Sequence, residues 1–118
     1  MKKAELGKTG EAVAAKYYLN KGCKLLAHNY RTRMGELDLV IQDQNEIVIV
    51  EVKTRTKSIL MHPAEAVNSA KQKKIILATE QFLQQFHLQG SCVRFDVVEV
   101  IPGESGWQIH CIKNAFEI

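Results

Sequence analysis

Residues 35–54 read GELDLVIQDQNEIVIVEVKT, and the rest of the chain can be interpreted outward from them. Polar and apolar residues alternate over 36–39, whereas an unbroken apolar run fills 47–50. Asp43, Gln44 and Asn45 form a short polar stretch between the two. Alternation predicts a strand with one buried face, and a continuous apolar run predicts a strand covered on both faces. We therefore expect strands over 35–42 and 46–54, paired as an antiparallel ribbon.

The flanking segments add helices and further strands to this ribbon. Apolar residues spaced in threes and fours predict a helix over 4–21 that ends at Gly22. Pro63 is expected to open a second helix, because proline lacks only an N–H that a first turn leaves unbonded, and Gly90 to end it. β-Branched and aromatic segments predict strands over 23–30, 92–101 and 107–112. The order αβββαββ needs a crossover, so the predicted class is α/β with a mixed central sheet flanked by helices.

Composition is typical of one folded domain spanning 1–118. The 118 residues are 46% hydrophobic and 25% charged, which is enough for a single core. The three cysteines are scattered and odd in number, so neither a disulfide framework nor a zinc cage is predicted, and we expect a cytoplasmic protein. No signal peptide or membrane span is expected, and no glycine-rich phosphate loop indicates a nucleotide cofactor.

The charges are unevenly distributed along the chain. Residues 1–33 carry eight basic and two acidic residues, residues 34–50 carry four acidic and no basic ones, and residues 51–74 carry six basic and two acidic ones. A solvated surface can produce such a pattern. A site that holds a divalent cation among carboxylates, with basic residues around it for phosphates, also produces it.

The ribbon is predicted to bring carboxylates together. Glu36 and Asp38 share one face of the first strand, while the opposite, buried face takes Leu37, Leu39 and Ile41. On the second strand Glu51 and Lys53 share a face. Pairing through the short turn would place Asp38 and Glu51 opposite or diagonal to each other, within about 5 to 8 Å.

Two interpretations fit this group. In the structural one, Lys53 neutralises Asp38 and Glu51 in a partly exposed ion cluster. In the functional one, the two carboxylates and the main-chain carbonyl of Val52 offer oxygen ligands suited to Mg²⁺ or Mn²⁺. Lys53 would then orient or deprotonate an attacking water, as phosphodiester hydrolysis requires.

The spacing of these residues resembles a known signature. Asp38, twelve intervening residues and Glu51-Val52-Lys53 resemble the D-x(n)-E-x-K motif of restriction-endonuclease-like nucleases, whose core has the order αβββαβ. More narrowly, the chain resembles the YraN family, small bacterial proteins predicted to be nucleases and similar to archaeal Holliday-junction resolvases. The segments that carry this resemblance are Gly10-Glu11, Asn29, residues 35–39, residues 50–55, Glu65-Ala66-Val67, Lys71-Gln72, residues 94–98 and residues 114–116.

The resemblance implies an acidic triad of Glu11, Asp38 and Glu51, with Lys53 as the site lysine. Glu11 would add a third carboxylate from the first helix, directly or through water. On the sequence alone, Glu11 fits a solvated helix face equally well.

Further residues are expected to contact the nucleic acid. Lys71 and Gln72 on the second helix are predicted to reach a phosphate, and Arg33 and Arg55 are further candidates. The loop 58–62 departs from the family pattern near Met61. Asp96 is expected to form a structural ion pair with Arg94 instead of taking part in catalysis.

The predicted function is metal-dependent hydrolysis of phosphodiesters in branched or otherwise structured DNA, with Mg²⁺ or Mn²⁺ as cofactor. A single site of this size cannot reach two strands, so a two-fold homodimer is expected on such a substrate. Two alternatives stay open. One is a non-catalytic nucleic-acid-binding or partner-docking module with the same fold, and the other is a structural protein whose acidic cluster is a salt-bridge network.

Overall fold

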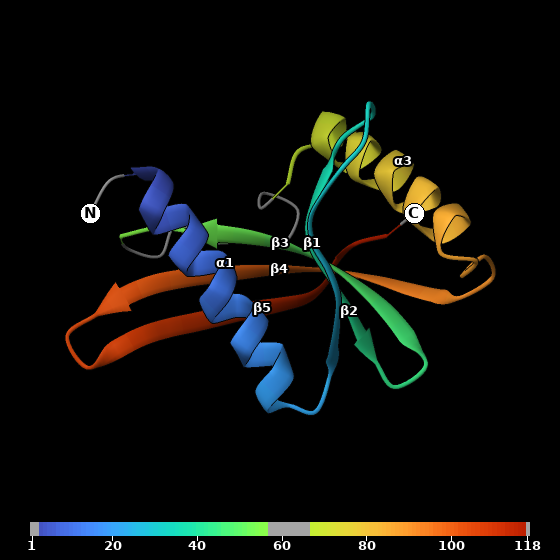
Figure 1. Ribbon diagram of the computed structural model, residues 1–118. Coiled ribbons are helices and arrows are strands. Elements are labelled where there is room, and N and C mark those ends of the chain that lie inside the picture. Colours follow the sequence, from blue (N-terminus) through green and yellow to red (C-terminus); the bar gives the residue numbers. More distant parts are fainter. Residues whose placement is uncertain (1–2, 57–66, 118) are drawn as a thin grey trace.

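The computed structural model describes residues 3–56 and 67–117 (Figure 1). The elements follow the predicted order and are α1 (Lys3–Asn20), β1 (Lys24–Arg31), β2 (Glu36–Asp43), β3 (Glu46–Thr54), α3 (Ser69–Gln85), β4 (Cys92–Gly103) and β5 (Gly106–Phe116). The predicted α/β class is confirmed, and β3 has the predicted bounds.

The strands form one mixed sheet in the order β1-β2-β3-β4-β5. β1, β2 and β3 are antiparallel neighbours, as are β4 and β5. β3 and β4 are parallel, and α3 lies in the connection between them. The sheet therefore has the crossover that the element order predicts, with β3 at its centre.

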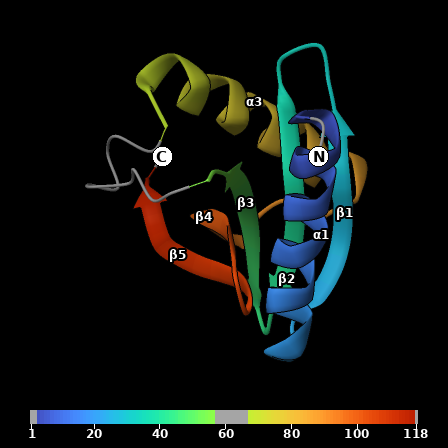
Figure 2. The same ribbon diagram turned by 90° about the vertical axis from the view of Figure 1, so that its left-hand side faces the viewer.

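The two helices cover opposite faces of the sheet (Figure 2). α1 packs with a cluster that includes Val48 and Val50 of β3, and α3 packs with a cluster that includes Ile47 and Ile49. Alternate residues of the apolar run thus enter two different cores. This explains why the strand is apolar on both faces.

One predicted face assignment is wrong. Leu37, Leu39 and Ile41 are all buried, but Leu37 packs in the α3-side cluster and the other two in the α1-side cluster. The ladder between β2 and β3 ends at the pair Leu39 and Val50. Beyond that pair β2 no longer runs beside β3, so simple alternation relative to β3 stops there.

The predicted continuous helix from Pro63 to Gly90 is also wrong at its start and at its end, because α3 ends at Gln85. The described helix begins at Ser69, and Asn68 has an extended backbone with φ −72° and ψ 166°. The Asn68 side chain accepts a hydrogen bond from the Lys71 N–H at 2.9 Å. An asparagine N-cap of this kind starts a helix and cannot lie inside one. Pro63 itself lies outside the described residues.

α1 ends where the sequence predicts. Gly22 follows the helix with φ +87°, a conformation that favours glycine. Within the part of the chain that the structure describes, neither helix is long and apolar enough to cross a membrane.

The predicted ion pair of Asp96 is confirmed as part of a buried network. Arg94 Nε lies 2.9 Å from Asp96 Oδ1, and Tyr18 donates its hydroxyl hydrogen bond to Asp96 Oδ2 at 2.8 Å. The N–H of Asn114 donates to Asp96 Oδ1 at 3.2 Å. Since Asp96 is fully buried, these contacts from α1, β4 and β5 compensate its desolvation.

Gly10 allows α1 to pack closely on the end of β3. A Cβ at this position would overlap the Thr54 hydroxyl oxygen and lie 3.0 Å from Thr54 Cβ. The neighbouring Glu11 is held beside the same end of β3 by this close approach.

We expect Gly10→Ala to destabilise the protein by about 1 to 3 kcal/mol, because the added methyl group overpacks the contact with Thr54. Without that contact Gly10→Ala should stabilise the protein, since alanine is favoured over glycine inside a helix by about 1 kcal/mol. Urea unfolding of Gly10→Ala in the Thr54→Ala background checks this. There the substitution should cost clearly less, because the hydroxyl and methyl groups of Thr54 are gone and only the 3.0 Å contact with Cβ is left. Equal destabilisation in both backgrounds would contradict the close-packing argument.

Candidate functional site

The site forms where β2 leaves β3. The last ladder pair is Leu39 with Val50, and the next residue of each strand, Asp38 on β2 and Glu51 on β3, lines the same pocket. Beyond this pair the Asp38 side chain replaces a main-chain acceptor, because the N–H of Val52 donates to Asp38 Oδ2 at 2.8 Å. A carboxylate thus ends the ladder and faces the next residues of β3.

Glu51 is the buried member of the pair, with only 3% of its surface exposed. Its Oε2 lies 3.3 Å from the Lys71 ammonium, and its Oε1 has no hydrogen-bond partner among the described residues. Burial and, to a lesser extent, the nearby Asp38 carboxylate outweigh the opposing effect of Lys71 and raise the pKa of Glu51 to about 7. At neutral pH this carboxyl is therefore poised between its two protonation states.

Two lysines flank the carboxylates. Burial lowers the pKa of the half-buried Lys53, and the neighbouring Lys71 ammonium lowers it further. Burial also lowers the pKa of Lys71, but Glu51 and Asp38 outweigh this effect and leave it raised. Lys71 is thus the permanent cation of the site, and Lys53 is the lysine that loses its proton more readily.

Asp38, Glu51 and Lys71 line a pocket of about 150 Å³ between the sheet and α3. Its remaining lining residues are Gly35, Glu36, Lys74 and Ile75. A Cβ on Gly35 would lie 2.8 Å from the Lys74 carbonyl oxygen, so glycine is required for the β1–β2 turn to approach α3. This approach closes one side of the pocket.

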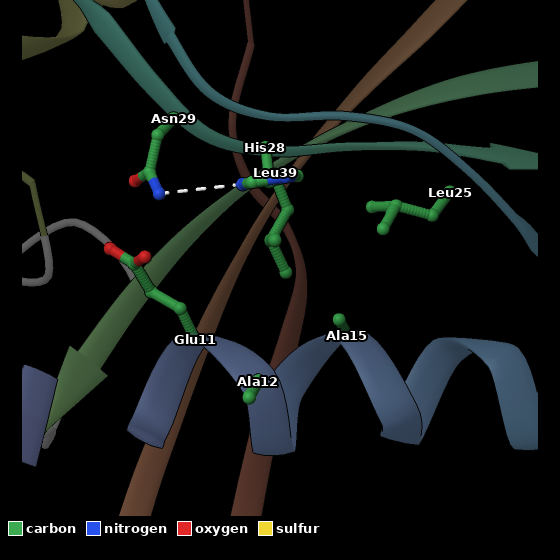
Figure 3. A pocket seen from close by; sticks show the side chains of 7 residues that line it. All are labelled: Glu11, Ala12, Ala15, Leu25, His28, Asn29 and Leu39. Carbon is green, nitrogen blue, oxygen red and sulfur yellow. Dashed lines mark hydrogen bonds between the residues drawn. The ribbon is translucent and has the colours of Figure 1, made fainter. Parts of the chain in front are cut away.

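Glu11 reaches the site region from α1 but lines a different pocket (Figure 3). That pocket has a volume of about 300 Å³, and Figure 3 shows Glu11 extending across it toward Asn29 of β1. Burial raises the pKa of Glu11, and so does the Asp38 carboxylate. Glu11 is therefore electrostatically coupled to Asp38 without lining the Asp38–Glu51 pocket.

The other residues predicted to bind nucleic acid have different surroundings. Gln72 donates its side-chain amide to the Val67 carbonyl at 2.8 Å, which ties down the start of α3. Arg55 donates its main-chain N–H to the Val100 carbonyl, and its buried Nε has no partner among the described residues. Arg33 is exposed in the turn between β1 and β2. The departing loop 58–62 lies outside the described residues.

Two charged residues near the site were not predicted. Lys74 lines the pocket, although nothing in the sequence distinguishes it from a solvated helix lysine. Glu99 is fully buried, pairs in register with Lys53 on one side and His110 on the other, and lies 3.3 Å from His110 Nδ1. A glutamate inside the apolar run Val97-Val98-Glu99-Val100-Ile101 was the available signal for it.

The donor set suits a hard cation held by two carboxylates. Among residues 3–56 and 67–117, no three side chains of His, Cys, Asp or Glu form a metal-binding group. Asp38 and Glu51 nevertheless offer carboxylate oxygens, one of them buried and unpartnered. Mg²⁺ characteristically uses one or two protein carboxylates and completes its coordination with water and substrate phosphates.

Glu51→Gln should make the free energy of unfolding of the metal-free protein depend less on pH. The folded pKa of about 7 exceeds the ordinary value of 4.5, so between these values the folded state holds more protons than the unfolded state. The free energy of unfolding contributed by Glu51 therefore falls as pH rises through this window. Glu51→Gln lacks this loss and should gain about 1 to 3 kcal/mol relative to wild type between about pH 5 and pH 8.

Urea unfolding in chelator at about pH 5 and about pH 8 measures this gain. Glu36→Gln, at an exposed glutamate, is the matched control. A difference between Glu51→Gln and wild type that does not change with pH would show that the Glu51 carboxyl is not perturbed.

Comparison with known proteins places the whole chain in one family. The model of the "Uncharacterised protein family UPF0102" matches residues 10–100. A UPF0102 protein of Clostridioides difficile is 40% identical over 116 residues, covering 98% of this chain and 100% of the relative. A UPF0102 protein of Desulforapulum autotrophicum is 41% identical over 115 residues, covering 98% of this chain and 95% of the relative. The chain therefore belongs to UPF0102, the YraN family that its motifs resemble.

Proposed function

We propose that this protein is a metal-dependent endonuclease that hydrolyses phosphodiesters in branched or otherwise structured DNA. The observation that carries the proposal is the Asp38–Glu51 pair. The two carboxylates line one pocket at the end of a core strand, and one of them is buried with an unpartnered oxygen. Folds seldom retain such repulsion and desolvation without a cation or a reaction that uses it.

Mg²⁺ or Mn²⁺ would be held by Asp38 and Glu51, with the Val52 carbonyl as a further oxygen and Glu11 acting from α1. Bound there, the cation would supply Lewis-acid stabilisation of the charge on a phosphate. The Val52 N–H bond to Asp38 fixes the orientation of that carboxylate in advance. The two-carboxylate donor set agrees with the preference of these ions for oxygen ligands.

The lysines take separate roles in this proposal. Lys53, whose pKa is lowered, orients the attacking water and accepts its proton. Lys71 neutralises Glu51 in the free protein, and it would become available to a substrate phosphate if Glu51 held the cation. Arg33, Arg55 and Gln72 are the further proposed contacts to the nucleic acid. Two copies of the chain would act on the two strands of a branched molecule.

A non-catalytic nucleic-acid-binding module is the second candidate function. It is favoured by the ion pair between Lys71 and Glu51, which occupies one carboxylate oxygen with a protein cation. In such a module, the fold and its basic residues would bind nucleic acid without turnover. The two functions differ in whether the carboxylates respond to a divalent metal.

Lys53→Ala should abolish cleavage of a four-way DNA junction in Mg²⁺ or Mn²⁺ and leave DNA affinity within about threefold of wild type, because Lys53 acts in the reaction step. Lys53→Arg should not restore the rate, since the guanidinium stays charged and cannot accept the proton. Lys73→Ala, an exposed lysine on α3, is the matched control. Wild-type cleavage by Lys53→Ala in single-turnover assays would remove Lys53 from the mechanism.

Asp38→Asn tests the metal site without any substrate. The asparagine keeps a carbonyl oxygen for the Val52 N–H but removes the repulsion with Glu51, so in chelator the variant should be as stable as wild type or up to about 2 kcal/mol more stable. With metal at about 100 times its Kd, wild type should gain about 2.7 kcal/mol and the variant little.

Thermal melting of wild type, Asp38→Asn and the control Asp43→Asn, with and without metal, measures this reversal. An Asp38→Asn protein that melts lower than wild type in chelator, together with no metal response in wild type, would support a structural ion cluster instead.

A further inference from the structure

A groove lies on the α1 side of the sheet, away from the Asp38–Glu51 pocket. We call it the α1–β5 groove, and its lining residues are Val13, Lys16, Tyr17, Asn20, Lys21, Trp107 and Ile109. Its volume is about 460 Å³, larger than that of the candidate site. In Figure 1 the β4–β5 hairpin extends beyond α1.

The groove is built from one helix face and one edge strand. The α1 residues have the spacing of a single helical stripe, and Trp107 and Ile109 are alternate residues of β5. Both β5 side chains pack against the α1-side core but are only partly buried. An aromatic surface therefore stays accessible at the sheet edge.

The charges of the groove select an anionic ligand. Its charged lining residues are Lys16 and Lys21, both exposed, and the Lys21 ammonium lies 4.5 Å from the centre of the Tyr17 ring. Glu104 precedes Trp107 in an exposed turn and does not line the groove.

A second copy of the chain fits this surface poorly. Two-fold pairing of the groove with itself would bring four lysine ammonium groups together, which is unfavourable. A single nucleic-acid strand instead combines flat bases with regularly spaced anions. Aromatic side chains flanked by basic ones are the common surface for such strands.

We propose that the α1–β5 groove binds an unpaired nucleic-acid segment, with a base stacked on Trp107 and phosphates bound by Lys16 and Lys21. The inference rests on the proposed function, since branched and structured DNA exposes unpaired segments beside the cleavage point. The groove would be a second contact to the substrate, and it would favour branched or structured DNA over fully paired duplex DNA.

Trp107 is the only tryptophan of the chain, so its fluorescence reports directly on the groove. Titration with a short oligothymidylate in chelator should quench the fluorescence to saturation. An abasic oligomer with the same phosphate backbone should quench little, because it has no base to stack. Trp107→Leu should weaken oligothymidylate binding about tenfold, measured by anisotropy of a labelled oligomer.

The contribution of Lys16 and Lys21 can be measured from the salt dependence of binding. Lys16→Gln and Lys21→Gln should each reduce the slope of log affinity against log salt by about 0.7, the value for one phosphate contact on a single strand. Lys24→Gln, an exposed lysine at the start of β1 on the opposite edge of the sheet, is the matched control and should leave the slope unchanged. These surface variants keep the proposal testable even if Trp107→Leu does not fold.

Three outcomes would overturn the proposal. Absence of quenching excludes stacking on Trp107, and equal quenching by the abasic oligomer leaves only phosphate binding. Fluorescence that changes with protein concentration alone, together with a dimer in sedimentation, assigns the groove to a second copy. Because binding is measured without metal, quenching without junction cleavage would support the groove and contradict the nuclease, and cleavage without quenching would do the reverse.

Discussion

The hydrogen bond from the Val52 N–H to Asp38 fixes the geometry of the candidate site. It replaces a ladder bond at the point where β2 leaves β3, so the main-chain donor is satisfied while the two strands separate. The separation leaves room for a pocket at the end of a core strand. It also places a second carboxylate, Glu51, in a buried position that an ordinary continuous ladder would fill with an apolar residue.

Several close contacts bring other elements to the same end of β3. Gly10 lets α1 approach Thr54, and Gly35 lets the β1–β2 turn approach Lys74 on α3. These contacts position Glu11 on one side of the strand and Lys71 on the other. The arrangement brings several charged side chains together at the end of β3, although burial disfavours their charged forms. The raised pKa of Glu51 is the direct sign of that conflict.

Local patterns predicted most of the fold. The apolar run of β3 gives its bounds and its coverage on both faces, and Gly22 marks the end of α1. Other features depend on tertiary contacts that no local pattern contains. The face of Leu37 depends on where β2 leaves β3, and the start of α3 depends on Asn68, whose side chain competes with helix continuation.

The candidate site, like the fold, could be predicted in part. The ribbon register predicts that Asp38 and Glu51 lie close together, because the turn length sets which residues of β2 and β3 pair. The two residues line one pocket, although the ladder itself ends one pair earlier, at Leu39 and Val50. The ion pair of Lys71 with Glu51 and the position of Lys74 in the pocket depend on how α3 docks across the sheet, which spacing alone does not define. Glu99 is brought beside Lys53 only by the parallel register of β3 and β4.

The central claim is that Asp38 and Glu51 hold a divalent cation. Anomalous diffraction from crystals grown with millimolar Mn²⁺ tests it most directly, because manganese can be located independently of any assumed activity. We predict one anomalous peak bound by both carboxylates, with the Lys71 ammonium moved away from Glu51. No peak between them, with Lys71 still paired to Glu51, would contradict the account.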